Sequence, residues 1–195
     1  TINGDLLNKY YTYSVTHGKT TKETADVYAK ACGVNGQRSM VVDLSTTNPD
    51  GWENDKHVLV QNQTDASVWE ISVADFSSSE SSGVSEANRG KYLAFTEEGT
   101  TVNGVQGASS TCVDYLKKLG VKYVQIMPFY DFGSVDESKN IMDQYNWGYD
   151  PVNYNCPEGS YSTNPKKGEV RIKECKQMIQ ALHNAGIGVI MDGVS

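Results

Sequence analysis

Residues 110–127 read Ser-Thr-Cys-Val-Asp-Tyr-Leu-Lys-Lys-Leu-Gly-Val-Lys-Tyr-Val-Gln-Ile-Met, the pattern of a helix followed at once by a buried strand. In the first part of this stretch an apolar residue recurs every three positions, at Val113, Leu116 and Leu119. This spacing predicts a helix over 110–119, with Ser110 or Thr111 placed to cap its first turn.

The alternation of strand and helix continues on both sides of this stretch. Gly120 can end the first helix, and the apolar run 121–127 after it predicts a buried strand. Further strands are expected at 68–76 and 187–191, the last after a helix over 170–185. That second helix has one apolar face, formed by Ile172, Cys175, Met178, Ile179 and Leu182. Apolar strands joined by helices predict an α/β fold with a parallel sheet.

The N-terminal third has a less regular pattern. Residues 10–16 are rich in aromatic and β-branched side chains and predict one strand, which ends at His17. Residues 18–65 are polar and rich in turn formers, with one short apolar run that starts at Met40. We interpret them as an irregular connector with one short buried strand, and we expect 77–110 to be a long loop rich in Ser, Gly and Glu.

Composition excludes several classes of partner. The 195-residue chain has a formal net charge of −7, which disfavours a nucleic acid or an anionic membrane, because both require a basic patch. No apolar run reaches the roughly 20 residues of a membrane span. The sequence starts without an initiator Met or a signal peptide, so we expect it to begin inside a longer polypeptide. It does not decide between a secreted and a cytoplasmic location.

The four cysteines are far apart and form no Cys-x-x-Cys pair, which disfavours zinc ligation and a redox motif. We expect Cys112 and Cys175 to be small apolar residues on helix faces, and Cys32 and Cys156 to lie in loops. His183, near the end of the second helix, is expected to be exposed and to interact with the helix dipole.

An aromatic segment follows the strand at 121–127. Residues 145–162 contain four tyrosines and a tryptophan together with two prolines and two glycines. Because the prolines exclude a regular helix, we expect a stiff, turning loop after the carboxyl end of a strand, where binding sites lie in such folds. Aromatic rings beside Asn and Asp suit a sugar, whose apolar face packs on the rings. The alternative is that these rings fill a small core under the loop.

Four motifs in this order carry a more specific resemblance. They are Trp-Glu-Ile-Ser-Val-Ala-Asp-Phe-Ser (69–77), Tyr-Val-Gln-Ile-Met-Pro (123–128), Tyr-Asn-Trp-Gly-Tyr-Asp-Pro (145–151) and Pro-Glu-Gly-Ser-Tyr-Ser (157–162). Together they closely resemble type I pullulanases, debranching members of the α-amylase superfamily, more than isoamylase or branching enzyme. The connector, with Val-Asn-Gly (34–36) and Met-Val-Val-Asp-Leu (40–44), looks like the segment that precedes the catalytic barrel in this family.

The resemblance implies a division of the chain into three parts. Residues 1–18 would be the end of an N-terminal β-sandwich carbohydrate-binding module, and 19–65 the connector. Residues 66–195 would then form the first three strands of a (β/α)₈ barrel, the fold in which α-amylases carry their active sites.

The resemblance also implies an activity. It is the hydrolysis of α-1,6 linkages in pullulan, amylopectin or limit dextrins by a retaining mechanism, with an Asp nucleophile, a Glu acid/base and a second Asp after the fourth, fifth and seventh strands. The third strand departs from the family's Met-Asp-Val-Val-Tyr-Asn-His and reads Met191-Asp192-Gly193-Val194-Ser195. No catalytic residue is assigned within the chain; all are expected beyond Ser195, and the chain alone is predicted to be inactive. The rival interpretation is a non-catalytic α-glucan-binding protein.

By the same resemblance, four residues are predicted to bind the glucan. Tyr149 is expected to stack under the sugar at the cleavage subsite, with Trp147 supporting the loop from beneath, Asn146 at the site and Asp150 organising the loop. No cofactor or metal site is assigned, although the family allows a structural calcium ion. The other carboxylates are expected to be solvated or to cap turns, and not to form an acid/base pair; they are Asp131, Asp136, Glu137, Asp143 and Glu158.

Overall fold

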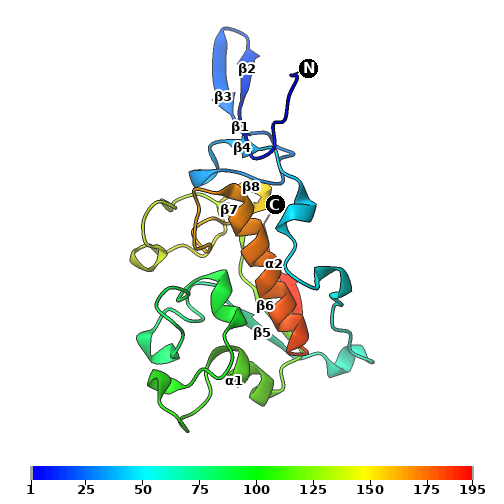
Figure 1. The fold of residues 1–195 in the computed structure, drawn as a ribbon, viewed down its shortest axis with the longest axis vertical. Helices are drawn as coiled ribbons and strands as arrows, with labels where there is room; N and C mark the ends of the chain where they lie inside the picture. The colour runs from blue at the N-terminus through cyan, green and yellow to red at the C-terminus, as the bar shows by residue number, and fades with distance from the viewer. Residues whose placement is uncertain (1, 195) are drawn as a thin grey trace.

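The computed structural model describes residues 2–194. Its centre is a parallel sheet in the order β5 (Val68–Ile71), β6 (Tyr123–Ile126) and β9 (Gly188–Met191). Two helices connect these strands, α1 (Cys112–Leu119) and α2 (Gly168–Asn184) (Figure 1). The predicted alternation and the parallel sheet are confirmed, although β5 ends at Ile71 and not at Phe76. Neither helix in this part of the chain is long and apolar enough to cross a membrane.

The main core fills one face of this sheet. Alternate residues of a strand point to opposite faces, and the buried face carries Ile71, Val124 and Ile126. Both helices pack there through their apolar sides, with Val113, Leu116, Cys175, Met178 and Leu182. The opposite face carries Glu70 and Ile190, which are both exposed.

The ends of the helices follow the sequence signals with one exception. Gly120 ends α1 in the left-handed conformation, at a φ of 78°, and its N–H donates to the carbonyl oxygen of Leu116. At the other end of α1 the predicted position of the cap is confirmed, but its side chain makes no capping hydrogen bond. Thr111 occupies the cap position, but its hydroxyl donates to the carbonyl oxygen of Ser82 and not to the first turn of the helix.

The predicted long loop at 77–110 contains three short 3₁₀ helices, η5 (Glu80–Ser82), η6 (Tyr92–Thr96) and η7 (Val102–Gly104). The middle one contributes to the main core. Phe95 stacks on Phe76 at a centroid distance of 4.5 Å, and the Tyr92 hydroxyl donates to the Glu158 carbonyl oxygen at 3.0 Å. Residues of this loop therefore form part of the core of the fold.

A second, antiparallel pair of strands lies beside the parallel sheet. β7 (Tyr130–Phe132) pairs with β8 (Pro151–Pro157), and the long loop 133–150 between them holds η8 (Ile141–Asp143). The sequence indicated only a loop here. Cys156 accordingly lies in a strand, which corrects the prediction for that cysteine, whereas Cys32, Cys112 and Cys175 lie where expected.

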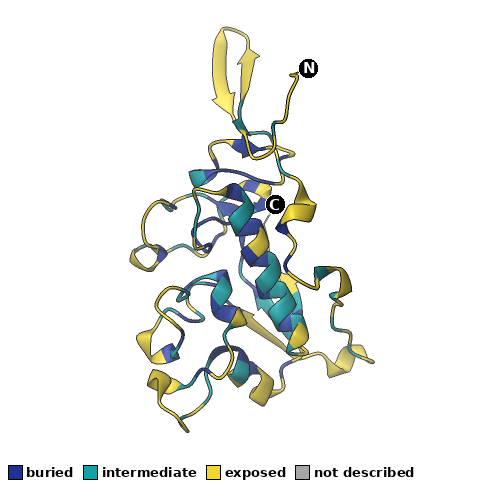
Figure 2. Ribbon diagram, viewed as in Figure 1, coloured by how far each residue is buried: buried dark blue, intermediate teal, exposed yellow. Residues whose placement is uncertain are grey.

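The N-terminal region differs most from its prediction. β1 (Tyr10–Tyr11) pairs with β4 (Ser39–Met40), and β2 (Tyr13–His17) forms an exposed hairpin with β3 (Thr20–Thr24) (Figures 1 and 2). The single strand predicted over 10–16 is therefore wrong, because it breaks at Thr12 and its two parts pair with different partners. The division of the chain at 18/19 and 65/66 stays a prediction.

The rest of the connector contains η1 (Val34–Gly36), η2 (Leu44–Thr47), η3 (Trp52–Asn54) and η4 (Gln63–Asp65), and its residues 44–55 contact α2. Lys176 of α2 donates to the carbonyl oxygen of Leu44 at 3.1 Å and to the Asn48 side chain at 2.6 Å. His183 Nδ1 lies 2.8 Å from Asp55 Oδ2, and both side chains are largely buried. The expected exposed role for His183 is therefore wrong; it holds the connector against the helix.

Candidate functional site

The aromatic segment lines a cleft of about 560 Å³ at the carboxyl ends of β5 and β6. Tyr149 and Trp147 are 41% and 55% exposed and face this cleft together with Tyr145. The other residues that line the cleft lie in β5 or shortly after the ends of β5 and β6. They are Trp69, Glu70, Ile71, Ser72, Asp75, Phe76 and Met127. The cleft thus combines flat aromatic surfaces with carboxylate and hydroxyl groups, a mixture that suits a polyhydroxylated ligand.

Hydrogen bonds within the loop hold these rings in place. The Asn146 side-chain amide donates to the Gly133 carbonyl oxygen at 2.7 Å and to Asp150 Oδ1 at 3.0 Å, and its oxygen accepts from the Gly148 N–H at 2.7 Å. Gly148 has a φ of +87°, a conformation that side chains disfavour. Asn146 and Asp150 therefore brace the loop that presents Trp147 and Tyr149.

Tyr149 is also tied to the third strand of the sheet. Its hydroxyl donates to Asp192 Oδ2, and Asp192, just after β9, receives its position from an N–H bond to the Ile126 carbonyl oxygen at 3.0 Å. The hydrogen bond to Asp192 is the largest cause that raises the pKa of Tyr149 to about 12. Gly193, where the sequence departs from the family's motif, lies beside the Tyr130 ring. The other departure, at Ser195, lies outside the described residues.

The structure brings all four predicted binding residues into one loop but gives them different positions. Tyr149 and Trp147 line the cleft, while the side-chain groups of Asn146 and Asp150 are bonded within the loop. The expectation that Trp147 supports the loop from beneath is wrong, because the residue is exposed and lines the cleft. Reasoning from sequence missed the contribution of Trp69 and Asp75, which the motif at 69–77 already contained.

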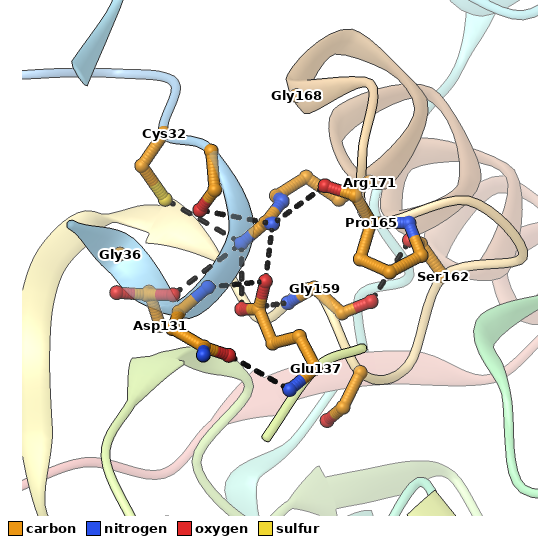
Figure 3. Close-up of polar contacts among 12 residues, drawn as sticks. Cys32, Gly36, Asp131, Glu137, Gly159, Ser162, Pro165, Gly168 and Arg171 are labelled. Carbon is orange, nitrogen blue, oxygen red and sulfur yellow. Dashed lines mark hydrogen bonds and ion pairs between the residues drawn. The ribbon is translucent and has the colours of Figure 1, made fainter. Parts of the chain in front are cut away.

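A buried polar cluster lies next to the loop, around Arg171 of α2 (Figure 3). The fully buried guanidinium pairs with Asp131 at 3.3 Å and with Glu137 at 2.7 Å. A third buried carboxylate, Glu158, accepts hydrogen bonds from the N–H groups of Phe132 and Ser160. We call Arg171, Asp131, Glu137 and Glu158 the Arg171 cluster.

The Arg171 cluster joins four segments of the chain. Besides its ion pairs, the guanidinium donates at 3.3 Å to the carbonyl oxygens of Gly33, Pro157 and Pro165. Asn153 of β8 donates to Asp131 at 2.7 Å and to the Gly36 carbonyl oxygen at 2.9 Å. Connector, β7, β8 and α2 therefore meet at one buried charge (Figure 3).

Three buried carboxylates lie close together here, and the Arg171 guanidinium pairs with two of them, Asp131 and Glu137. Burial is the largest cause that raises the pKa of Asp131 to about 7 and that of Glu158 to about 8, with repulsion among the carboxylates adding to it. Ligand atoms of the three carboxylates lie within 4.8 Å of one another, the spacing of a cation site. A calcium ion does not fit, because it would stand against the Arg171 guanidinium that already pairs with two of them.

The expectation that Asp131, Glu137 and Glu158 are solvated is wrong, since all three are buried. Glu158 nevertheless caps a turn, because its carboxylate accepts from the Ser160 N–H. Asp136 also caps a turn, because its carboxylate accepts from the Ser138 N–H. One signal for the cluster was present in the sequence. Arg171 stands four residues before Cys175 and seven before Met178, on the apolar side of α2, where a charge must find buried partners.

The raised pKa values of Glu158 and Asp131 predict a loss of stability with rising pH. Both groups bind a proton more tightly in the folded chain, so their contribution is complete near pH 4 and is lost as the pH rises through about 7 to 8. We expect urea melts to give a free energy of unfolding that falls between pH 5 and pH 8, by up to ~1.4 kcal/mol per pH unit for each proton released.

Glu158→Gln is the control for this dependence, because glutamine cannot release a proton in this range. The variant should show a shallower decline between pH 5 and pH 8 than the unmodified chain. Stability that stays constant or rises over this range in the unmodified chain would contradict the raised pKa values of Asp131 and Glu158.

Comparison with known proteins connects this geometry to a family. The model of the α-amylase catalytic domain matches residues 70–195, which is most of the chain. This range contains β6, β9 and the second half of β5. The chain belongs to the α-amylase family. Its α/β architecture is accordingly part of a barrel of the TIM type, in which β5, β6 and β9 are neighbouring parallel strands.

Among α-amylase relatives the chain is similar to pullulanases. It is 41% identical to the pullulanase of Bacillus subtilis over its full length, and it spans 26% of that protein. The crystal structure of the pullulanase from Bacillus acidopullulyticus gives a TM-score of 0.90 at 48% identity, covering 98% of this chain and 23% of that one. The pullulanase of Paenibacillus barengoltzii, solved as a mutant complexed with maltotriose, gives 0.88 at 47% identity, covering 94% and 28%. The resemblance to pullulanases is confirmed, and the chain spans about a quarter of these relatives.

Proposed function

We propose that the chain forms the aromatic wall of the substrate cleft in a pullulanase-type glycoside hydrolase. The substrate would be an α-glucan with α-1,6 linkages, such as pullulan, amylopectin or a limit dextrin. The single observation that carries this proposal is the cleft lined by Tyr149 and Trp147 at the carboxyl ends of the barrel strands. Sites of barrel enzymes lie at this face.

Support for a glucan comes from the rings and from the relatives. A pyranose can stack on Tyr149, whose ring is fixed by its hydroxyl bond to Asp192 and by the brace of Asn146. Pullulanases of similar structure have been solved with maltotriose, maltotetraose and maltohexaose. Within the site, Tyr149 and Trp147 would contact the sugar, and Asn146 and Asp150 would act through the shape of the loop.

Catalysis in this proposal needs residues outside the chain. The mechanism would be retaining, with two carboxyl groups about 5 to 5.5 Å apart across the bond that breaks. The carboxylates of the Arg171 cluster cannot serve, because they are buried and already engaged with Arg171 and backbone N–H groups. Residues 1–195 alone are therefore expected to bind glucan without cleaving it, and no reducing ends should form on incubation with pullulan.

Replacing Tyr149 by alanine tests the binding site. Loss of one large stacked ring costs about 1.5–3 kcal/mol, so Tyr149→Ala should weaken the retardation of the chain in a pullulan gel at least about tenfold. Tyr149→Phe is the matched control: it keeps the ring, removes only the bond to Asp192, and should retain most of the binding. An unmodified chain that pullulan does not retard, or an alanine variant that binds as well, would contradict the proposal.

The second candidate is a non-catalytic α-glucan-binding protein. The exposed rings of Trp147 and Tyr145 favour binding as such, since they would serve as a platform without any catalytic group. The two candidates are separated by assaying reducing ends with the protein as its source makes it. Turnover of pullulan by that protein supports the hydrolase, and binding without turnover supports the platform.

A further inference from the structure

The loop 133–150, which presents the aromatic wall, is fixed at three places. At its base the Gly133 N–H donates to the Asp150 carbonyl oxygen at 2.9 Å, and in its middle Ile141 is buried in the main core. The third place is the segment that begins with Asp136 and Glu137, and its partner is the connector, about one hundred residues earlier in the sequence.

This third contact is a reciprocal pair of hydrogen bonds between Asn35 and Glu137. The Asn35 N–H donates to Glu137 Oε2 at 2.9 Å, and the Glu137 N–H donates to Asn35 Oδ1 at 2.8 Å. Glu137 is buried and its carboxylate also forms the ion pair with Arg171. Because a buried N–H without an acceptor costs about 1–3 kcal/mol, the Asn35 side chain sets where this part of the loop lies.

From Glu137 the constraint reaches the aromatic residues through Gln144. The Gln144 side chain accepts from the Asp136 N–H at 2.7 Å and donates to the Asp136 carbonyl oxygen at 3.0 Å. Gln144 directly precedes Tyr145, the first ring of the aromatic wall. The path from the connector to the cleft is therefore Asn35, Glu137, Asp136, Gln144 and the aromatic segment.

We propose that Asn35 is a positioning residue of the glucan site. The connector then helps to fix the loop that lines the cleft, and does not only join two parts of the chain. The inference rests on the proposed function for its effect on glucan affinity. Its structural half, that the Asn35 side chain fixes the position of Trp147, stands independently of any ligand.

The sequence offers a matched control for Asn35. The tripeptide Val-Asn-Gly occurs at 34–36 and again at 102–104, and both copies form a 3₁₀ turn with Asn at a positive φ, 58° at Asn35 and 56° at Asn103. Glycine adopts this conformation without strain, so Asn→Gly removes only the side chain at either site. Asn103 is exposed and lies in the loop 77–110, and its side chain forms no hydrogen bond with residues 133–150 in the described part of the chain.

The experiment compares Asn35→Gly with Asn103→Gly in the 195-residue chain labelled with 5-fluorotryptophan. The chain has three tryptophans, Trp52, Trp69 and Trp147, so ¹⁹F NMR gives three signals that single Trp→Phe variants assign. We expect Asn35→Gly to shift or broaden the Trp147 signal, to leave Trp52 in the connector unchanged, and to weaken retardation by pullulan about threefold or more. Asn103→Gly should change none of these.

Each outcome decides the proposal. A Trp147 signal that is the same in Asn35→Gly as in the unmodified chain overturns it, and so does an equal shift in Asn103→Gly. A shifted Trp147 with unchanged glucan affinity overturns the role in binding. If pullulan does not retard the unmodified chain, the proposed function fails, while the Trp147 signal still decides whether Asn35 positions the loop.

Discussion

Arg171→Met is expected to lower the free energy of unfolding by about 3–5 kcal/mol, a large part of the about 5–15 kcal/mol that stabilises a typical domain. The substitution keeps a long side chain on α2 but leaves the buried carboxylates of Asp131 and Glu137 without their only cation within the cluster. It also removes the donor for the carbonyl oxygens of Gly33, Pro157 and Pro165. Urea melts followed by circular dichroism at pH 8, above the pKa of about 7 of Asp131, measure the loss.

Lys176→Met is the control for this effect. Lys176 lies on the same helix and also bonds the connector, but it is partly exposed, and its contacts are to neutral oxygens and to the ring of Trp52. The same change of a long cation to methionine should therefore cost about 1 kcal/mol or less. Equal losses for the two variants would show that burial of the charge does not determine the stability of this region.

The regular elements of the chain could be predicted because each is encoded by its own residues. The apolar spacing in α1 and α2 and the apolar runs of β6 and β9 depend on neighbours within one segment. The antiparallel strands were missed because β7 and β8 are joined by the long loop 133–150, and a pairing over that distance leaves no local pattern. The N-terminal prediction failed for a related reason, since Tyr10 and Tyr13 pair with different partners.

The candidate site shows the same limit. The motif at 145–151 directed attention to Tyr149 and Trp147, which both line the cleft, because a short segment supplies both rings; their role in binding stays a prediction. The partner of Tyr149, Asp192, lies 43 residues later, and Asn35, which holds Glu137, lies 102 residues earlier. Such contacts follow from the packing of the whole chain. Arg171 is intermediate, because its place on an apolar helix face signals a buried charge but not which carboxylates surround it.

Gly148→Ala is expected to abolish measurable binding of pullulan while most of the fold remains. An added Cβ at Gly148 would lie 2.6 Å from the Pro128 carbonyl oxygen and 3.0 Å from the Phe132 ring, and the φ of +87° is itself unfavourable for alanine. Both obstacles consist of backbone or core atoms that cannot move aside cheaply. The loop must shift instead, which breaks the Asn146 brace and moves Trp147 and Tyr149 away from the cleft.

Gly107→Ala separates the steric effect from backbone strain. Gly107 has a similar φ of +81°, but an added Cβ there would meet nothing within 4 Å. It should cost only the strain of about 1–2 kcal/mol and leave retardation by pullulan unchanged. Affinity electrophoresis and urea melts of both variants provide the comparison. Binding retained in Gly148→Ala would show that the placement of the two rings does not depend on this turn. Binding lost in Gly148→Ala but kept in Gly107→Ala would show that the close approach of the backbone at Gly148 is what places Trp147 and Tyr149 in the cleft.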